Sequence, residues 1–362
     1  MARLRVEDRH SLRVACRKAC DAPDVLILLD RRAGLALLLV SMLGEQVGKP
    51  GFQQAGALCR RPMGMWQQVA AIYNARGPMA GGHMTQIARC GVVGHPIAHS
   101  LSPDIHHAFA AQFGRRLEYQ RIDLAPEQLE EGVRAFFAAG GTGLNITLPH
   151  KSAAAHLATN IGPWAQRLGA VNMLTREAGG SISGENVDGA ALVHDLTERY
   201  RVDLRGHDAL VLGAGGAGRA AVWALLDAGT RQITVINRHP AGADALVDAI
   251  GMPGRVHSRY WKDIANIGVF DLIINATSTG VLGEHLELPF KLVTPRATCY
   301  DLSYGRAASD FIGWAHTSGA RYAFDGLGML IEGGAMAYTR WFGEAPDTEP
   351  VFAALRAQHP QA

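Results

Sequence analysis

One glycine-rich hexapeptide limits the possible folds of this chain more than any other feature. Residues 213–218 read GAGGAG, a G-x-G-x-x-G pattern that follows a strand-like apolar run and opens a helical pattern ending near residue 228. A strand, a tight glycine turn and a helix in this order let backbone N–H groups and the helix dipole meet a pyrophosphate. We therefore predict a dinucleotide-binding fold here, with a glycine turn that binds no ligand as the alternative.

Strand-like and helical patterns alternate on both sides of the hexapeptide, which predicts an α/β protein. After it the order is that of a doubly wound sheet, and before it two β-α units indicate a smaller, largely parallel α/β domain. The expected strands are residues 87–93, 117–122, 143–147, 209–212, 232–236, 270–274 and 298–302. The expected helices are residues 103–113 with Ser102 as N-cap, 126–138, 186–200, 241–250, 327–342 and 351–358.

The residue after the second strand of the nucleotide-binding unit indicates which dinucleotide is bound. That strand ends in Ile236-Asn237-Arg238, where a site for NAD usually has Asp or Glu for the ribose 2′-hydroxyl. An Arg instead suits a 2′-phosphate, by charge and by bidentate geometry. The sequence thus favours NADP, and an exposed arginine in an arginine-rich chain is the alternative.

Lys151 stands out because the chain has 30 arginines but only five lysines. A lysine can give up its proton where an arginine cannot. Lys151 follows a strand end and turn, the place where α/β sheets present ligand-contacting residues, and Asp188 lies at the head of an expected helix. A Lys–Asp pair can pass a proton to or from an alcohol while hydride moves. On these residues alone, two unrelated surface charges are the alternative.

Two further groups of polar residues are open to more than one interpretation. Ser100 and Ser102 precede an expected helix, so they either cap it or bind a carboxylate with help from the helix dipole. His95, His99, His106, His107 and His150 lack metal-ligand spacing, and we interpret them as turn or surface residues. Cys16 and Cys20 have no second pair nearby, so we expect no metal site.

Composition excludes several classes of protein. The chain is 48% hydrophobic and 19% charged, which argues against global disorder, and no apolar run reaches the ~20 residues of a membrane span. Residues 84–362 carry 23 Lys and Arg against 27 Asp and Glu, which offers no basic surface for nucleic acid. Only two of the five cysteines lie there, as suits a reducing cytosol. We expect a soluble cytoplasmic protein without nucleic-acid or membrane partners.

Nine short segments, taken in order, point to one family. They are GHPIAHSLSP (94–103), NITLPHK (145–151), GAVN (169–172), ENVDG (185–189), GAGGAG (213–218), NR (237–238), INATSTG (274–280), DLSY (301–304) and DGLGML (325–330). From about residue 86 to about residue 343 the chain resembles the shikimate dehydrogenases. The resemblance implies an N-terminal α/β substrate domain facing a Rossmann-type, doubly wound NADP-binding domain. It also implies reversible NADPH-dependent reduction of 3-dehydroshikimate to shikimate, on the route to chorismate and the aromatic amino acids.

The resemblance implies a role for each matching residue. Lys151 would be the general acid/base beside the reacting carbonyl, with Asp188 as its partner. Ser100 and Ser102 would bind the substrate carboxylate, Thr147, Asn172 and Asp188 would contact ring hydroxyls, and Tyr304 would stand near the substrate. The residues expected to contact the cofactor are Gly213, Ala214, Gly215, Gly216, Ala217, Asn237, Arg238, Thr277, Ser278, Leu302 and Gly326.

The chain departs from the family's pattern in three places. The family usually has a substrate-contacting Gln where this chain has Gly333, so one hydrogen bond is expected to be missing, or to come from Glu332 or water. Val187 stands where the family prefers Thr, and residues 305–310 lack the usual Thr-Pro. A quinate or quinate/shikimate dehydrogenase is therefore the nearest alternative, and a catalytically silent ligand-binding homologue is a more distant one.

Residues 1–83 match none of these segments. They carry 12 Lys and Arg against six Asp and Glu, and Met84 directly precedes the first expected strand. We expect them to be an atypical extension, either outside the native enzyme or loosely attached. The predicted domains are residues 84–190 for substrate binding and catalysis and 191–326 for NADP, with helices within 327–362 packing back onto the first domain. We expect a monomer or a homodimer.

Overall fold

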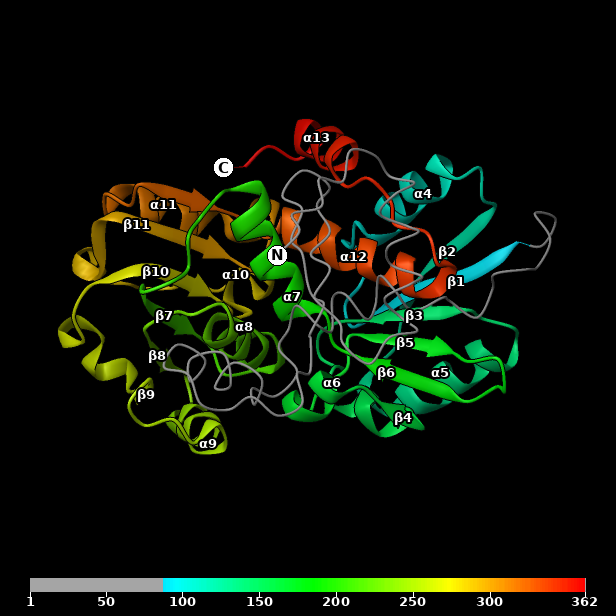
Figure 1. Cartoon of the computed structure of the whole chain (residues 1–362), viewed down its shortest axis with the longest axis horizontal. Coiled ribbons are helices and arrows are strands. Elements are labelled where there is room, and N and C mark those ends of the chain that lie inside the picture. Colours follow the sequence, from blue (N-terminus) through cyan, green and yellow to red (C-terminus); the bar gives the residue numbers. More distant parts are fainter. Residues whose placement is uncertain (1–86, 362) are drawn as a thin grey trace, which may run out of the picture. The chain divides into compact units, whose positions relative to one another are not determined.

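A computed structural model describes residues 87–361, which build two six-stranded sheets covered by helices (Figure 1). All of these residues belong to one compact unit of the chain. The first sheet uses residues before 186 and the second uses residues after 207. The predicted α/β class is therefore confirmed.

The first sheet has the strand order β2-β1-β3-β5-β6-β4. β1 pairs in parallel with β2 and β3, as predicted, because a helix crosses over between successive strands. β4 also pairs in parallel with β6, whereas β5 pairs antiparallel with both β3 and β6, so the sheet is largely parallel, as expected, with one antiparallel strand. The strands are β1 (Ala88–Gly94), β2 (Leu117–Asp123), β3 (Gly143–Ile146), β4 (Asn160–Ile161), β5 (Met173–Arg176) and β6 (Ile182–Glu185).

Helices of this first part include one whose start differs from the prediction. Ser102 is the first residue of its helix rather than the N-cap, and Leu101 holds the cap position. The Ser102 hydroxyl accepts a hydrogen bond from the Ser100 hydroxyl at 3.2 Å instead of capping. The helices are α4 (Ser102–Gln112), α5 (Leu129–Ala138) and α6 (Pro163–Leu168), with 3-10 turns η1 (Pro126–Gln128) and η2 (Ala153–Leu157).

The second sheet is parallel throughout, with the order β12-β11-β10-β7-β8-β9. The chain winds from β7 toward β9 on one side and from β10 toward β12 on the other, so the direction reverses between β7 and β10. Ligands of doubly wound sheets bind at this switch point, beyond the carboxyl ends of the strands. The strands are β7 (Asp208–Leu212), β8 (Gln232–Ile236), β9 (Val256–Arg259), β10 (Phe270–Asn275), β11 (Val293–Asp301) and β12 (Tyr322–Phe324).

The helices that accompany the second sheet mostly follow the predicted pattern. α8 and α9 stand where helices were expected, whereas two shorter ones were not predicted. These helices are α8 (Gly216–Asp227), α9 (Pro240–Ile250), α10 (Thr279–Leu282) and α11 (Ser309–Thr317), with 3-10 turns η4 (Trp261–Asn266), η5 (Phe290–Leu292) and η6 (Gly305–Ala308).

Two helices that pack on each other connect the two halves (Figure 1). α7 (Asp188–His194) runs into a π-helical turn, η3 (Asp195–Arg199), and packs on α8. A Cβ at Gly189 would lie 2.7 Å from the Ala220 carbonyl oxygen, so the backbones of α7 and α8 touch directly there. α12 (Leu327–Phe342) packs on α4 and α7, and α13 (Glu349–Gln358) packs on α12.

The predictions about the N-terminal extension, membrane spans and metal sites can be compared with the structure only for residues 87–361. The expected extension at 1–83 and the pair Cys16 and Cys20 lie outside the described residues. Within 87–361, no helix is long and apolar enough to cross a membrane. In the same residues no group of three or more His, Cys, Asp or Glu side chains is arranged to hold a metal ion.

Candidate active site

Lys151 and Asp188 meet, which the sequence alone could not decide. The Lys151 ammonium donates to Asp188 Oδ2 at 2.6 Å, and the two side chains are 20% and 11% exposed. The Asn172 amide donates to the other carboxylate oxygen, Oδ1, at 2.7 Å. Both oxygens of Asp188 are therefore occupied, and the carboxylate is held in one orientation.

The surrounding backbone explains how residues far apart in sequence form this cluster. The Val171 N–H donates to the Lys151 carbonyl at 2.7 Å, which ties the turn after β3 to the segment before β5. Asn172 Oδ1 accepts from the Val187 N–H, and Asn186 Oδ1 accepts from the Asp188 N–H. Asp188 opens α7, and the positive end of a helix dipole stabilises a carboxylate at that position.

A second polar group lies near the carboxyl ends of β1 and β3, which are neighbouring parallel strands. Ser100 and Ser102 are buried and linked through their hydroxyls. The main chain of Leu101 hydrogen-bonds to the Tyr304 hydroxyl, and burial raises the pKa of that phenol. Thr147 follows β3, and its methyl group would lie 2.7 Å from a Cβ at Gly94. The structure thus brings Tyr304, which follows β11, to Leu101, the residue between the two serines.

Three residues beside the serines were not predicted from the sequence to be functional. Asn145 Oδ1 accepts from the Tyr119 hydroxyl at 2.7 Å and lies 3.1 Å from His106 Nε2. His106 is 1% exposed and stacks on Tyr119, so its interpretation as a turn or surface residue is wrong. Burial lowers the pKa of His106 to about 3, so the imidazole is neutral at physiological pH. Helical spacing could have shown this, because His106 shares a face with Ser102 and Phe109.

The glycine turn has the shape of a ligand cradle. Gly213 has φ +108°, and a Cβ there would lie 2.8 Å from the Ala276 carbonyl oxygen. A Cβ at Gly218 would lie 2.1 Å from the Gly213 carbonyl oxygen, so only glycine lets α8 start this close to the turn. A Cβ at Gly215 would meet nothing within 4 Å, and this open space is where a pyrophosphate would lie. These residues fit a dinucleotide.

The cradle adjoins the Lys–Asp pair. A Cβ built on Gly216 would lie 3.7 Å from Lys151 Cβ and 3.6 Å from Ala170 Cβ. Gly216 is also the first residue of α8, so the start of that helix faces the turn that carries Lys151. A group bound on the cradle would therefore stand next to the residue expected to handle the proton.

The other expected cofactor residues surround the carboxyl edge of the second sheet. Asn237 Oδ1 accepts from the Ala214 N–H at 3.1 Å, so its amide braces the glycine turn. Thr277 donates to Asn275 Oδ1 at 2.7 Å, and Ser278 precedes α10. A Cβ at Gly326 would lie 2.4 Å from the Leu302 carbonyl oxygen, which places these two residues in contact. Arg238 is exposed, and its guanidinium pairs with Glu284.

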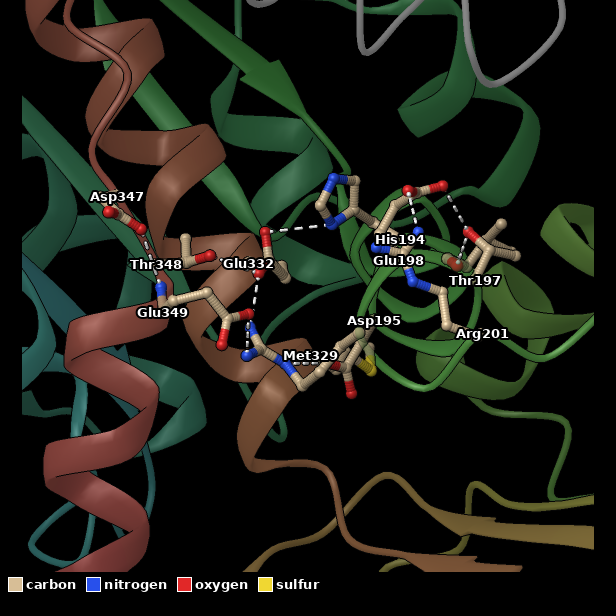
Figure 2. Close-up of polar contacts among 12 residues, drawn as sticks. His194, Asp195, Thr197, Glu198, Arg201, Met329, Glu332, Asp347, Thr348 and Glu349 are labelled. Atoms are coloured by element: carbon tan, nitrogen blue, oxygen red, sulfur yellow. Dashed lines mark hydrogen bonds and ion pairs between the residues drawn. The ribbon is translucent and has the colours of Figure 1, made fainter. Parts of the chain in front are cut away.

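Glu332 does not take over the function of the missing glutamine. Its carboxylate is directed toward His194 (Figure 2), with Oε2 3.2 Å from His194 Nδ1. Its Oε1 accepts from Arg199 Nη2 at 2.8 Å and from the Thr348 hydroxyl at 2.7 Å. With 3% exposure, Glu332 belongs to a buried ionic cluster between η3, α12 and the segment before α13. The expectation that it contacts substrate is therefore replaced by a structural role.

Comparison with known proteins decides the family. Residues 92–174 match the shikimate dehydrogenase substrate binding domain, and residues 195–282 match the shikimate / quinate 5-dehydrogenase domain. The shikimate dehydrogenase (NADP(+)) of Xylella fastidiosa is 48% identical over 275 residues, which cover 75% of this chain and 97% of that protein. This chain belongs to the shikimate dehydrogenase family.

Solved structures of similar proteins show the same architecture as this family member. The Ael1 enzyme from Pseudomonas putida is 37% identical with a TM-score of 0.67, covering 74% of this chain and 98% of its own. Shikimate 5-dehydrogenase from Thermus thermophilus, solved in complex with NADP(H) and shikimate, is 33% identical with a TM-score of 0.66. That match covers 75% of this chain and 99% of the Thermus chain. The predicted pair of a substrate-binding part and a Rossmann-like part is confirmed.

Proposed function

We propose that this chain catalyses the reversible, NADPH-dependent reduction of 3-dehydroshikimate to shikimate. One observation carries the proposal: Lys151, paired with Asp188 at 2.6 Å, lies against the first residue of α8 at the glycine cradle. A carbonyl reduction needs a hydride at carbon and a proton at oxygen, delivered to adjacent atoms. The site offers a place for a hydride donor and a lysine proton donor side by side.

Each residue around Lys151 and Asp188 is proposed to have its own role in the reaction. Lys151 donates a proton from Nζ to the carbonyl oxygen as that oxygen becomes an alkoxide, and it accepts the proton in the reverse direction. Asp188 orients the ammonium, and Asn172 fixes Asp188 by donating to its second oxygen. Ser100 and Ser102 bind the substrate carboxylate, while Thr147 and Tyr304 line the same end of the site.

Bound NADPH supplies the hydride. The backbone of residues 213–217 is proposed to hold the pyrophosphate, with Asn237 bracing the turn and Arg238 binding the 2′-phosphate. Thr277 and Ser278, together with Leu302 and Gly326, are proposed to flank the nicotinamide half. Support comes from the relatives, which are NADP(+)-dependent, and from the open space at Gly215.

A four-way steady-state assay tests the function, with shikimate or quinate as the acid and NADP⁺ or NAD⁺ as the cofactor. We expect the highest kcat/KM with shikimate and NADP⁺, on the full chain and on a chain that starts at Met84. Lys151→Ala should lower kcat about 10²–10⁴-fold. Lys291→Ala, an exposed lysine on the same chain, is the matched control and should leave kcat unchanged. Undiminished turnover by Lys151→Ala would refute the proposed mechanism.

Quinate is kept as a second candidate substrate because of Gly333. A Cβ at this position would meet only Ala191 Cβ, at 3.7 Å, so α12 has no side chain there to contact a ring hydroxyl. Quinate turnover with a kcat/KM at or above that of shikimate would move the assignment to a quinate/shikimate dehydrogenase. Shikimate binding without turnover would favour a ligand-binding homologue.

We extend the proposal to the location, assembly and domain organisation of the enzyme. We place the enzyme in the cytoplasm as a monomer or homodimer, with small-molecule ligands and no nucleic-acid or membrane partner. We assign residues 84–190 to the substrate domain and 191–326 to the NADP domain, with residues 327–362 returning to the first. The packing of α12 on α4 and β5 supports this return.

A further inference from the structure

An ion pair joins Arg238 to Glu284 across the proposed nucleotide site. Arg238 Nη2 donates to Glu284 Oε2, and the side chains are 63% and 44% exposed. The two residues are 46 positions apart in the chain. Arg238 is the residue proposed to bind the 2′-phosphate of NADP, so its guanidinium already holds an anion before any cofactor arrives.

The strand order shows what this ion pair spans. Arg238 follows β8, and Glu284 follows β10 and α10. β8 and β10 are the two neighbours of β7, one on each side, and β7 leads directly into the glycine cradle. A contact between the segments after β8 and after β10 therefore passes over the carboxyl end of β7, where the cofactor is proposed to bind.

Glu284 is held in this position by its own segment. Its N–H donates to the Thr279 carbonyl at 2.8 Å, which closes the turn after α10. The next residue, His285, contacts Asp310 at 2.6 Å through Nδ1. A Cβ at Gly280 would lie 1.8 Å from the Ala307 carbonyl oxygen, so α10 packs directly against η6. The carboxylate is thus presented by an anchored turn.

A carboxylate and a phosphate compete for the same donors on a guanidinium, because both accept two parallel N–H hydrogen bonds. We propose that Glu284 competes with the 2′-phosphate of NADP for Arg238 and thereby sets the affinity of the enzyme for NADP. This inference rests on the proposed cofactor site. A 2′-phosphate carries up to two negative charges and displaces the single charge of Glu284, whereas NAD has a neutral hydroxyl at the 2′ position and brings no anion to Arg238.

The exposure of the pair sets the size of the effect. Solvent-exposed ion pairs contribute ~0.2–1 kcal/mol, so removing the competitor should tighten NADP⁺ binding about 1.5- to 5-fold. Because the interaction is electrostatic and exposed, the difference between variants should shrink as ionic strength rises.

The experiment compares dissociation constants for NADP⁺, measured by titration calorimetry on the full chain in low salt. Glu284→Gln removes the competing charge and keeps the size of the side chain. Glu287→Gln is the matched control, because it removes the same charge from an exposed residue three positions away. Both substitutions are then repeated in an Arg238→Gln background, and thermal unfolding confirms that every variant is folded.

The proposal expects Glu284→Gln to lower the NADP⁺ Kd, Glu287→Gln to leave it unchanged, and the Glu284 effect to vanish in the Arg238→Gln background. An equal gain from both Gln variants would show a general charge effect and overturn it. An unchanged or raised Kd for Glu284→Gln would also overturn it. Absence of NADP⁺ binding by the unmodified chain would instead refute the proposed function itself, so the two failures are distinguishable.

Discussion

Truncating Glu332 tests whether the buried ionic cluster is structural or part of substrate binding. In Glu332→Ala, three donors lose their acceptor: Arg199 Nη2 at 2.8 Å, the Thr348 hydroxyl at 2.7 Å and His194 Nδ1 at 3.2 Å. Breaking a buried ion pair costs ~3–5 kcal/mol, because the remaining charge is left without its partner.

The lower end of that range applies to this cluster. Arg199 keeps Asp195 Oδ1 at 2.7 Å and an ion pair with Glu349, so its charge stays compensated. We therefore expect Glu332→Ala to lower the free energy of unfolding by about 3 kcal/mol, which for a chain of this size corresponds to a fall in Tm of about 4–5 °C.

The assay pairs thermal unfolding with steady-state kinetics. Glu130→Ala, which breaks the exposed pair with Arg134, is the control and should cost at most ~1 kcal/mol. The KM for shikimate should stay the same in Glu332→Ala, because the carboxylate faces His194, Arg199 and Thr348. A raised KM with an unchanged Tm would refute the structural reasoning and restore Glu332 as a substrate ligand.

The same variant has a predictable pH dependence. Burial lowers the pKa of His194, but the Glu332 carboxylate outweighs burial, so the pKa of His194 is raised. Burial raises the pKa of Glu332, but His194 and the other neighbours outweigh burial, so the pKa of Glu332 is lowered. The His194 contribution is present below its unfolded pKa of ~6.5 and is lost as pH rises through the folded pKa. The Glu332 contribution is present above its unfolded pKa of ~4.3 and is lost as pH falls. The stability gap between wild type and Glu332→Ala should therefore be widest between about pH 4.5 and 6.5.

Four other substitutions probe the rest of the site. Gly218→Ala should destabilise the fold by ~1–3 kcal/mol in thermal unfolding, since its Cβ would lie 2.1 Å from a carbonyl oxygen, whereas Gly215→Ala should keep the Tm and weaken NADP⁺ binding in calorimetry. Burial raises the pKa of Asp301 to about 7, so the contribution of Asp301 to stability should fall as pH rises from ~4 to 7, and urea titrations should show that Asp301→Asn gains stability relative to wild type over this range. Gly333→Gln should gain ~0.5–1 kcal/mol of helix stability and lower the KM for shikimate. An unchanged KM would show that a glutamine at this position does not contact the substrate.

The sequence predicted those parts of the fold in which one strong pattern repeats. β8 and α12 were predicted to the residue, because apolar runs with clear ends leave little choice of boundary. β5 and β6 have four residues each and were missed, because a two-residue period cannot be recognised over so short a length. The antiparallel pairing of β5 with β3 and β6 is the exception to the β-α alternation from which a largely parallel sheet was predicted.

For the site, the sequence identified residues but not their orientation. Lys151 and Asp188 were chosen from chemistry and family motifs, yet only the fold shows that they touch. Glu332 and Gly333 are adjacent and therefore point about 100° apart on one helix. Which of the two faces the substrate depends on how α12 packs on α7 and η3. That packing involves residues far apart in the sequence, so a local sequence pattern cannot predict it.

The contact at Gly189 also fixes how far Asp188 can move from the glycine turn. Asp188 stands next to the residue whose backbone touches α8, and α8 begins at the cradle, so the Asp188 carboxylate and the start of α8 keep a fixed separation. Ser100, Ser102 and Thr147 belong to segments of the other sheet, and this contact does not hold them. A side chain larger than hydrogen at position 189 would force α7 away from α8 and so shift Asp188 relative to the cradle.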